Sequence, residues 1–127
     1  EYATATLAPP WELQDVVNGS FKESSDNYRF PYGWKFEKGS NNTPMTFKAS
    51  GKGIFILFQS NQNDAFGNLK VTVNGKTSVI SGKRNYAWGG PDTEIAYIQD
   101  TSGTLDVSIC MENANTEFSI WGIGVIK

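Results

Sequence analysis

The feature that most constrains the fold of this chain is a period of two residues in its hydrophobic pattern. Leu69, Val71 and Val73 alternate with polar residues, and the segments 105–111 and 117–125 alternate in the same way. Successive side chains of a β-strand point to opposite faces of a sheet, so this pattern predicts strands with one buried face. No window has a convincing helical period.

Turn-forming residues separate these segments at intervals of about 8–12 residues, which is typical of β-sandwiches. Asn74-Gly75 directly follows the 69–73 segment and is a preferred two-residue hairpin turn. The run IFILF at 54–58 is apolar on both faces, as expected of a central strand covered on both sides. The sequence therefore predicts an all-β fold, a two-sheet antiparallel β-sandwich. The other expected turns are Gly39-Ser40, Gly51 to Gly53, Asn63 to Gly67, Ser81-Gly82, Gly89 to Pro91, Ser102-Gly103 and Asn113 to Asn115.

The length of 127 residues fits a single domain, 1–127, in which residues 1–10 form a tail or an edge strand. Because the chain starts at Glu1, we expect a module excised from a larger enzyme. The net charge is −2, which argues against a nucleic-acid partner. No apolar run reaches the roughly 18 residues that a membrane span needs, so no membrane partner is expected.

The absence of histidine excludes Ser-His-Asp and Cys-His catalysis and the usual zinc sites. A glycosidase needs two carboxylates about 5–9 Å apart, and a pair such as Glu94 and Glu112 stays open. A small sandwich without a deep cleft is nevertheless a poor host for catalysis, so we expect no enzyme activity in this module. No cofactor is predicted. A structural calcium ion held by loop residues such as Asp64 and Asp92 is an open alternative without a defining spacing.

The chain has 4 Trp, 5 Tyr and 8 Phe, and flat aromatic faces suit the C–H faces of sugar rings. Trp88, in NYAWGGPD, precedes a glycine corner that would leave its ring open, and Tyr86 shares its face by the period of two. Trp34, in PYGWKFE, is a second candidate. For each ring, the alternative is a place in the core.

Trp121 follows from the same alternation. Phe118 and Ile120 are expected in the core, which places Trp121 on the other face of its strand. An outward Trp is costly unless it is used or covered, so either a ligand or the N-terminal segment with Trp11 is expected to cover it.

The segment 59–64 has four carboxamides in five residues, including Gln59, Asn61 and Gln62. Each side-chain amide both donates and accepts hydrogen bonds, which matches the vicinal hydroxyls of a sugar. Gln59 has the parity of Phe55 and Leu57 and should lie on a sheet face beside the aromatic rings. The alternative for this segment is a solvated turn.

The order of motifs from Thr43 to Lys127 adds a resemblance. It runs through TPMTFKASGKGIFILF, QSNQNDAFGN, LKVTVNGK, AWGGPDTEI, LDVSICM and EFSIWGIGVI. This order resembles the β-jelly-roll modules appended to SGNH esterases and glycanases of gut bacteria that degrade plant cell walls, including family 65-type binders of β-glucan and xyloglucan. The resemblance implies a jelly roll with a binding role, but no map of ligand residues.

Two hypotheses follow. The first is a secreted bacterial carbohydrate-binding module, monomeric and attached to a catalytic domain, that binds plant cell-wall polysaccharides such as β-1,4-glucan, mixed-linkage glucan or xyloglucan. The second is a structural or protein-interaction sandwich that packs against a catalytic domain. The residues predicted to bind the polysaccharide are Trp34, Gln59, Asn61, Gln62, Tyr86, Trp88 and Trp121.

Overall fold

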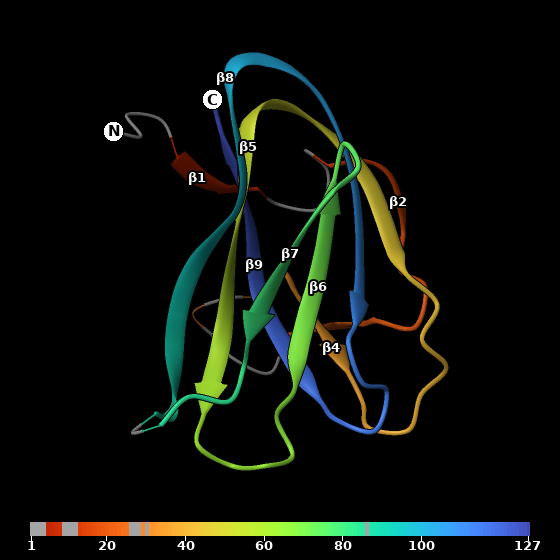
Figure 1. Cartoon of the computed structure of the whole chain (residues 1–127), viewed down its shortest axis with the longest axis vertical. Helices are drawn as coiled ribbons and strands as arrows, with labels where there is room; N and C mark the ends of the chain where they lie inside the picture. Colours follow the sequence, from red (N-terminus) through yellow and green to blue (C-terminus); the bar gives the residue numbers. More distant parts are fainter. Residues whose placement is uncertain (1–4, 9–12, 26–28, 30, 86) are drawn as a thin grey trace.

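The computed structural model describes residues 5–8, 13–25, 29, 31–85 and 87–127, with the side chains of 5–8 left out (Figure 1). These residues form an all-strand, antiparallel structure that contains no helix, and so no helix able to span a membrane. The strands are β1 (Ala5–Ala8), β2 (Gln14–Val17), β3 (Lys22–Ser24), β4 (Gly33–Phe36), β5 (Met45–Asn61), β6 (Asn68–Val73), β7 (Lys76–Ser81), β8 (Trp88–Met111) and β9 (Phe118–Ile126).

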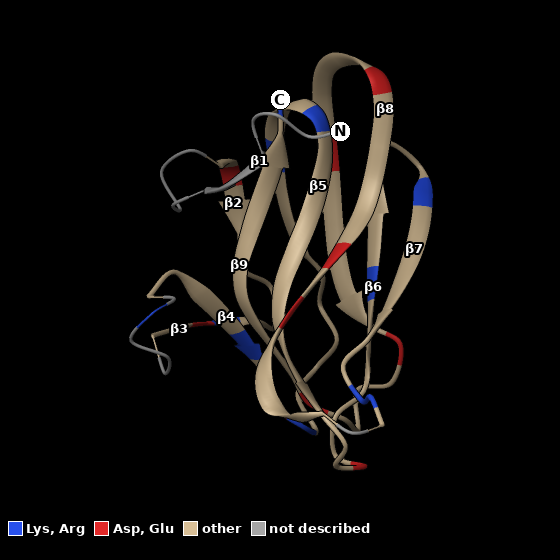
Figure 2. Cartoon of the chain, turned by 90° about the vertical axis from the view of Figure 1, so that its left-hand side faces the viewer, with Lys and Arg blue, Asp and Glu red and all other residues tan. Residues whose placement is uncertain are grey.

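Two long strands, β5 and β8, pair with each other along most of their length and pass through both layers of the sandwich (Figures 1 and 2). The first layer contains β3, β4, β9, β1, residues 53–61 of β5 and residues 88–98 of β8. The second layer contains β2, residues 45–51 of β5, residues 103–111 of β8, β6 and β7. The predicted two-sheet sandwich is confirmed, although hydrogen bonds join its layers into one continuous sheet.

Three expected turns are wrong, because their residues lie inside these long strands. Gly51 to Gly53 and Ser102-Gly103 belong to the bend at which β5 and β8 cross together between the layers, and the ladder shifts register there. Glycine allows this close crossing, since a Cβ on Gly53 would lie 2.4 Å from the Tyr97 carbonyl oxygen. The third turn, Gly89 to Pro91, lies at the start of β8. The only described strand partner of this segment is β5, and proline is tolerated on such a sheet edge.

The core lies between the two layers and takes its side chains from the predicted apolar positions. Met45, Phe47 and Leu105 in the second layer and Ile54 and Ile56 in the first belong to one hydrophobic cluster. The predicted alternation is confirmed at 69–73 and 105–111, where every other residue is buried. The Asn74-Gly75 hairpin is also confirmed, with φ angles of 49° and 85° in the left-handed region that this turn needs.

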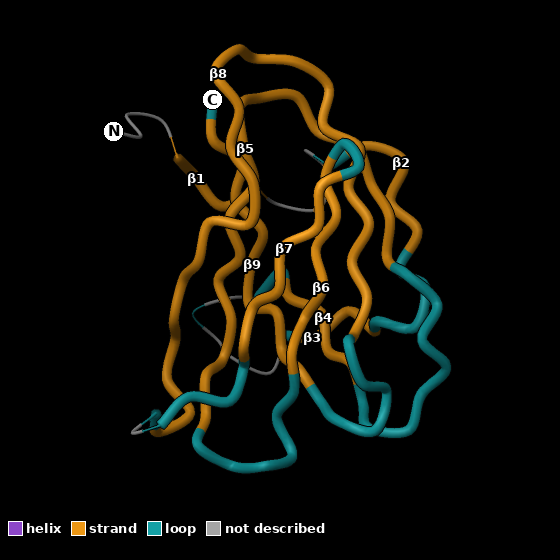
Figure 3. Tube along the Cα trace, viewed as in Figure 1, coloured by secondary structure: helices purple, strands orange, loops and turns teal. Residues whose placement is uncertain are grey.

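Most loops gather at one end of the sandwich, and the long-strand bends form the opposite end (Figure 3). The loop 62–67, which follows β5, is the centre of the loop end. Its Gly67 amide donates to the Glu117 carbonyl oxygen over 3.0 Å, and its Gly67 carbonyl accepts from the Gly82 amide over 2.9 Å. These backbone bonds tie the loops after β5, β7 and β8 to one another.

Candidate functional site

Trp88 begins β8 at the loop end, opposite Asn61 in the register of the β5–β8 ladder. Its side chain is 85% exposed, so the indole of Trp88 is open, as its sequence context predicted. Gly89 follows with a φ of 84°, a conformation that residues with a Cβ rarely adopt. Glycine therefore allows a left-handed backbone position within β8, directly after the ring.

Two carboxamides of β5 lie beside Gly89. The Gln59 Nε2 donates to the Gly89 carbonyl oxygen over 3.2 Å, and the Asn61 Oδ1 accepts from the Asn63 amide over 3.0 Å. A Cβ built on Gly89 would lie 3.2 Å from Gln59 Nε2 and 3.4 Å from Asn61 Nδ2, so both amide groups flank this glycine. Among the described residues, no partner engages Gln59 Oε1 or Asn61 Nδ2.

Gln62 extends the same amide-rich edge. It is exposed, and its backbone amide donates to the Ala87 carbonyl oxygen over 3.3 Å, immediately before Trp88. The structure thus brings together four of the predicted site residues: Gln59, Asn61, Gln62 and Trp88. Tyr86 lies outside the described residues.

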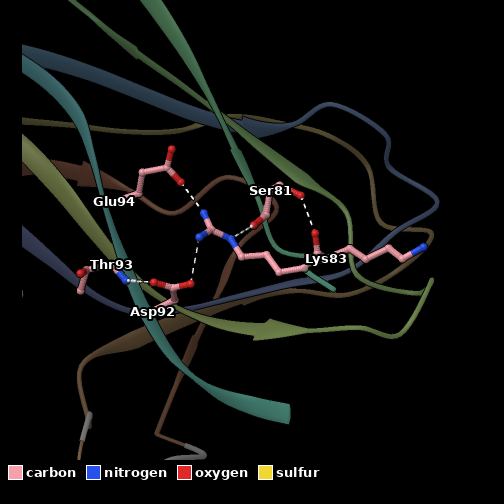
Figure 4. Close-up of polar contacts among 6 residues, drawn as sticks. Ser81, Lys83, Asp92, Thr93 and Glu94 are labelled. Atoms are coloured by element: carbon pink, nitrogen blue, oxygen red, sulfur yellow. Dashed lines mark hydrogen bonds and ion pairs between the residues drawn. The ribbon is translucent and has the colours of Figure 1, made fainter. Parts of the chain in front are cut away.

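An arginine-centred cluster holds the segment that leads into Trp88 (Figure 4). The guanidinium of Arg84 donates from Nη1 to Asp92 over 2.9 Å and from Nη2 to Glu94 over 2.5 Å. Its Nε donates to the Ser81 carbonyl oxygen over 3.1 Å, and its Cζ lies 5.1 Å from the centroid of the Phe58 ring. The cluster ties residues 81–84 to Asp92 and Glu94 in the first half of β8, so its partners lie on either side of Trp88 in the sequence.

Lys83 is also paired, since its Nζ donates to the Asp64 carboxylate. The hydrogen bond and the charge of Lys83 lower the pKa of Asp64 below its ordinary value of 3.8. Both cations near Trp88 are therefore matched by carboxylates. No group of three acidic or cysteine side chains that could hold a metal ion occurs in the described part of the chain.

The prediction that Trp34 presents its ring to a ligand is wrong. Its side chain is 1% exposed, and its Nε1 donates to the Asn18 Oδ1 over 3.1 Å. The physical reason is the position of β4, which lies between β3 and β9 in the first layer. Trp34 pairs with the buried Ile120 and shares its inward parity, so it belongs to the core.

Trp121 lies in the same layer as Trp88 but on β9, with β5 between them. It is half-buried and occupies an irregularity of the β5–β9 ladder, where Leu57 pairs with Gly122 and Phe58 with Ile120. Trp121 already has an interaction partner within the protein. Trp11, the residue proposed to cover it, lies outside the described residues.

The two carboxylates considered for catalysis have separate partners. Glu94 is bound to Arg84, whereas the Glu112 carboxylate accepts from the Asn68 side chain over 2.9 Å.

Sequence reasoning missed the arginine cluster and the Gly89 carbonyl. The available signal was Arg84 followed by Asp92 and Glu94, opposite charges on either side of a short glycine-containing loop.

No protein-family profile matches the chain, and no curated protein matches it. Solved structures do. A two-domain esterase active on acetylated mannans, crystallised with mannopentaose, superposes with a TM-score of 0.76 at 14% identity, over 98% of this chain and 36% of the esterase. The family 35 carbohydrate-binding module of Cellvibrio japonicus Abf62 superposes with a TM-score of 0.62 at 15% identity, over 98% and 94% of the two chains. A family 35 module in complex with a disaccharide containing glucuronic acid has a TM-score of 0.55 at 14% identity, over 97% and 93%.

At these identities the similarity defines the fold: a jelly-roll sandwich of the type present in carbohydrate-binding modules and esterase domains. The chain spans about a third of the length of the mannan esterase, 36%. The resemblance to family 65 binders stays a prediction.

Proposed function

We propose that this protein is a non-catalytic carbohydrate-binding module that holds a neutral plant cell-wall glycan against Trp88. The observation that carries the proposal is the 85% exposed indole of Trp88, which pairs in register with Asn61 and precedes Gly89, the glycine flanked by the amides of Gln59 and Asn61. Exposed apolar surface that is rimmed by polar groups is typical of ligand-binding sites. A sugar ring offers this partner an apolar C–H face for the indole and hydroxyls for the amides.

The charges around Trp88 favour a neutral glycan. Lys83 is bound by Asp64, and Arg84 by Asp92 and Glu94. A uronate would need a free cation, and recruiting Lys83 or Arg84 would leave the carboxylates of their present partners close to the bound uronate. This site chemistry differs from that expected of a glucuronic acid binder, although a similar module binds such a disaccharide.

Within neutral glycans we propose β-glucans: β-1,4-glucan, mixed-linkage glucan or xyloglucan. Trp88 and the amides would bind a short stretch of chain. Tyr86, and Trp121 on β9 at the far side of β5, remain proposed contacts. A mannan is the main alternative ligand, because one similar esterase was co-crystallised with mannopentaose. Another similar esterase was solved in complex with cellohexaose, a β-1,4-glucan fragment.

The mechanism would be targeting. A module that holds the polymer raises the local substrate concentration for a catalytic domain on the same chain. The similar structures include two-domain esterases, which supports an attached esterase or glycoside hydrolase, and with it secretion from a bacterium.

A second function, packing of the sandwich against a neighbouring protein domain, is favoured by one observation. Ile95 and Ile98 on β8 are 41% and 48% exposed, which leaves an aliphatic strip on this strand. This strip has no polar groups to orient a sugar, so it would serve protein contact rather than glycan binding.

Affinity gel electrophoresis separates the two functions. Native gels would contain hydroxyethylcellulose, mixed-linkage glucan, xyloglucan, galactomannan or glucuronoxylan, with an inert protein as the mobility reference. We expect retardation by at least one neutral glucan and none by glucuronoxylan at equal concentration. Normal mobility in every gel would reject glycan binding and leave the protein-packing function.

A further inference from the structure

A groove lies on the outer face of the second layer. It has a volume of about 360 Å³, within the range of small-molecule sites, about 300–1,000 Å³. This groove is separate from Trp88, which lies in the first layer at the loop end. Its lining residues are Asp15, Thr46, Phe47, Lys48, Thr72, Asp106, Val107 and Ser108.

The floor of the groove is a row of hydroxyls that crosses the strands. Thr46 on β5 pairs with Ser108 on β8, and Ser108 pairs with Thr72 on β6. The row continues to Thr77 on β7, where the Thr72 and Thr77 Oγ1 atoms are 2.8 Å apart. Each hydroxyl can both donate and accept, so the row can adapt to either role of a ligand hydroxyl.

The sides of the groove bear charges. Asp15 stands in β2 with a φ of 55°, at an irregularity of the β2–β5 ladder that leaves it out of the regular pairing. Lys48 and Asp106 face each other with a nitrogen–oxygen distance of 3.9 Å, and both side chains are more than half exposed. Exposed pairs of this kind contribute little to stability, so a ligand can replace the contact at small cost.

Three polar side chains of the groove are available. Among the described residues, Asp15, Thr46 and Ser108 have no side-chain hydrogen-bond partner. Two carboxylates and one ammonium disfavour an anionic ligand. Carboxylates and hydroxyls in one groove match a molecule with several neutral hydroxyls.

We propose that this groove is a second saccharide-binding site, free of aromatic platforms, that takes a short stretch of neutral sugar chain. Asp15 and Asp106 accept hydrogen bonds from sugar hydroxyls, and Lys48 donates. Thr46, Ser108 and Thr72 form the floor, on which the threonine methyl groups contact the sugar ring. The site rests on its own residues and does not require Trp88 to bind sugar.

The test is a titration of the ¹⁵N-labelled protein with cellohexaose, mannohexaose and xylohexaose at millimolar concentration, followed by NMR. At least one sugar should shift the amides of 46–48, 72 and 106–108. The double variant Thr46→Val, Asp106→Ala should weaken binding in the groove by about tenfold or more, since it removes two hydrogen-bonding groups. Ser50→Ala, a matched change on β5 beyond the groove, should bind as the wild type does.

The outcomes separate the two sites. Shifts around 88–91 that disappear in Trp88→Ala, without any shift in the groove, would overturn the second site and support the first. Groove shifts that persist in Trp88→Ala support the second site, and if no amide near Trp88 moves, the proposed function at Trp88 is rejected. Equal binding in the groove by the wild type and by a folded double variant would also overturn the second site.

Discussion

Replacing either of two tryptophans by alanine should separate binding from folding in this sandwich. Trp88 is 85% exposed and Trp34 is 1% exposed, so the same change removes an open ring in one variant and a core ring in the other. A fully enclosed aromatic side chain buries about 150–250 Å², so one stacked face covers about 80 Å². At about 25 cal/mol per Å², Trp88→Ala should cost about 2 kcal/mol of binding free energy, or about thirtyfold in Kd.

The loss of stability should be small in Trp88→Ala, the variant that loses binding, and large in Trp34→Ala. Trp88→Ala should change the free energy of unfolding by less than about 0.5 kcal/mol, as exposed substitutions usually do. Trp34→Ala should cost about 3–5 kcal/mol, because it opens a core cavity and removes the 3.1 Å bond to Asn18. For a domain of this size, that loss lowers Tm by about 10 °C or more.

The assay pairs thermal unfolding, followed by far-ultraviolet circular dichroism, with isothermal titration of the best glycan from the gel panel. Trp34→Ala should bind with near wild-type affinity at a temperature where it is folded. The reasoning is refuted if Trp88→Ala lowers Tm as much as Trp34→Ala does, or if it binds the glycan with unchanged affinity.

Three further predictions concern the surroundings of Trp88. Gly89→Ala should cost about 1 kcal/mol of stability, because φ is 84°, and should weaken glycan binding because its Cβ would displace the Gln59 amide, 3.2 Å away. Gly90→Ala, where a Cβ meets nothing within 4 Å, is the control, and equal behaviour of both variants in melting and titration would contradict this. Arg84→Met should lower the free energy of unfolding, measured in urea, by about 1–2 kcal/mol, because it leaves the carboxylates of Asp92 and Glu94 without their cation. The control, Lys22→Met at an exposed ion pair, should cost less than about 0.5 kcal/mol. Similar losses in the two variants would show that the cluster is not structural. Glycan affinity should be constant from about pH 5 to pH 8, because the chain has no histidine to titrate there. The pKa of Asp64 is lowered, so its ion pair with Lys83 stays intact until the pH falls below the ordinary value of 3.8. A midpoint in the affinity between pH 5 and pH 8 would disprove this prediction.

The alternation of apolar residues predicted the strands well. Within one strand, the face on which a residue lies depends only on its near neighbours in the sequence. The buried positions of 69–73 and 105–111 and the Asn74-Gly75 hairpin follow from a few neighbouring residues. The same argument placed Gln59 near the aromatic site, and the structure has it beside Gly89.

Predictions that depended on distant pairing failed. Gly51 to Gly53 has the composition of a turn, but β8 accompanies β5 through it, and pairing across about 50 residues is invisible in a local pattern. Trp34 was misplaced for the same reason, since its burial depends on β3 and β9 lying on either side of β4. Arg84 was overlooked because its carboxylate partners come from the next strand.

The passage of β5 and β8 through both layers limits where the chain can change in length. An added or lost residue in a strand inverts the facing of every later side chain. In an ordinary sandwich that error stays in one sheet. Here, one residue added to β5 before Gly51 would disturb either the hydroxyl row of the second layer or, beyond the bend, the amide edge at Gln59 and Asn61. The register already slips at the bend and again between Ile54 and Phe55, so a change in length there could be absorbed and leave both surfaces intact.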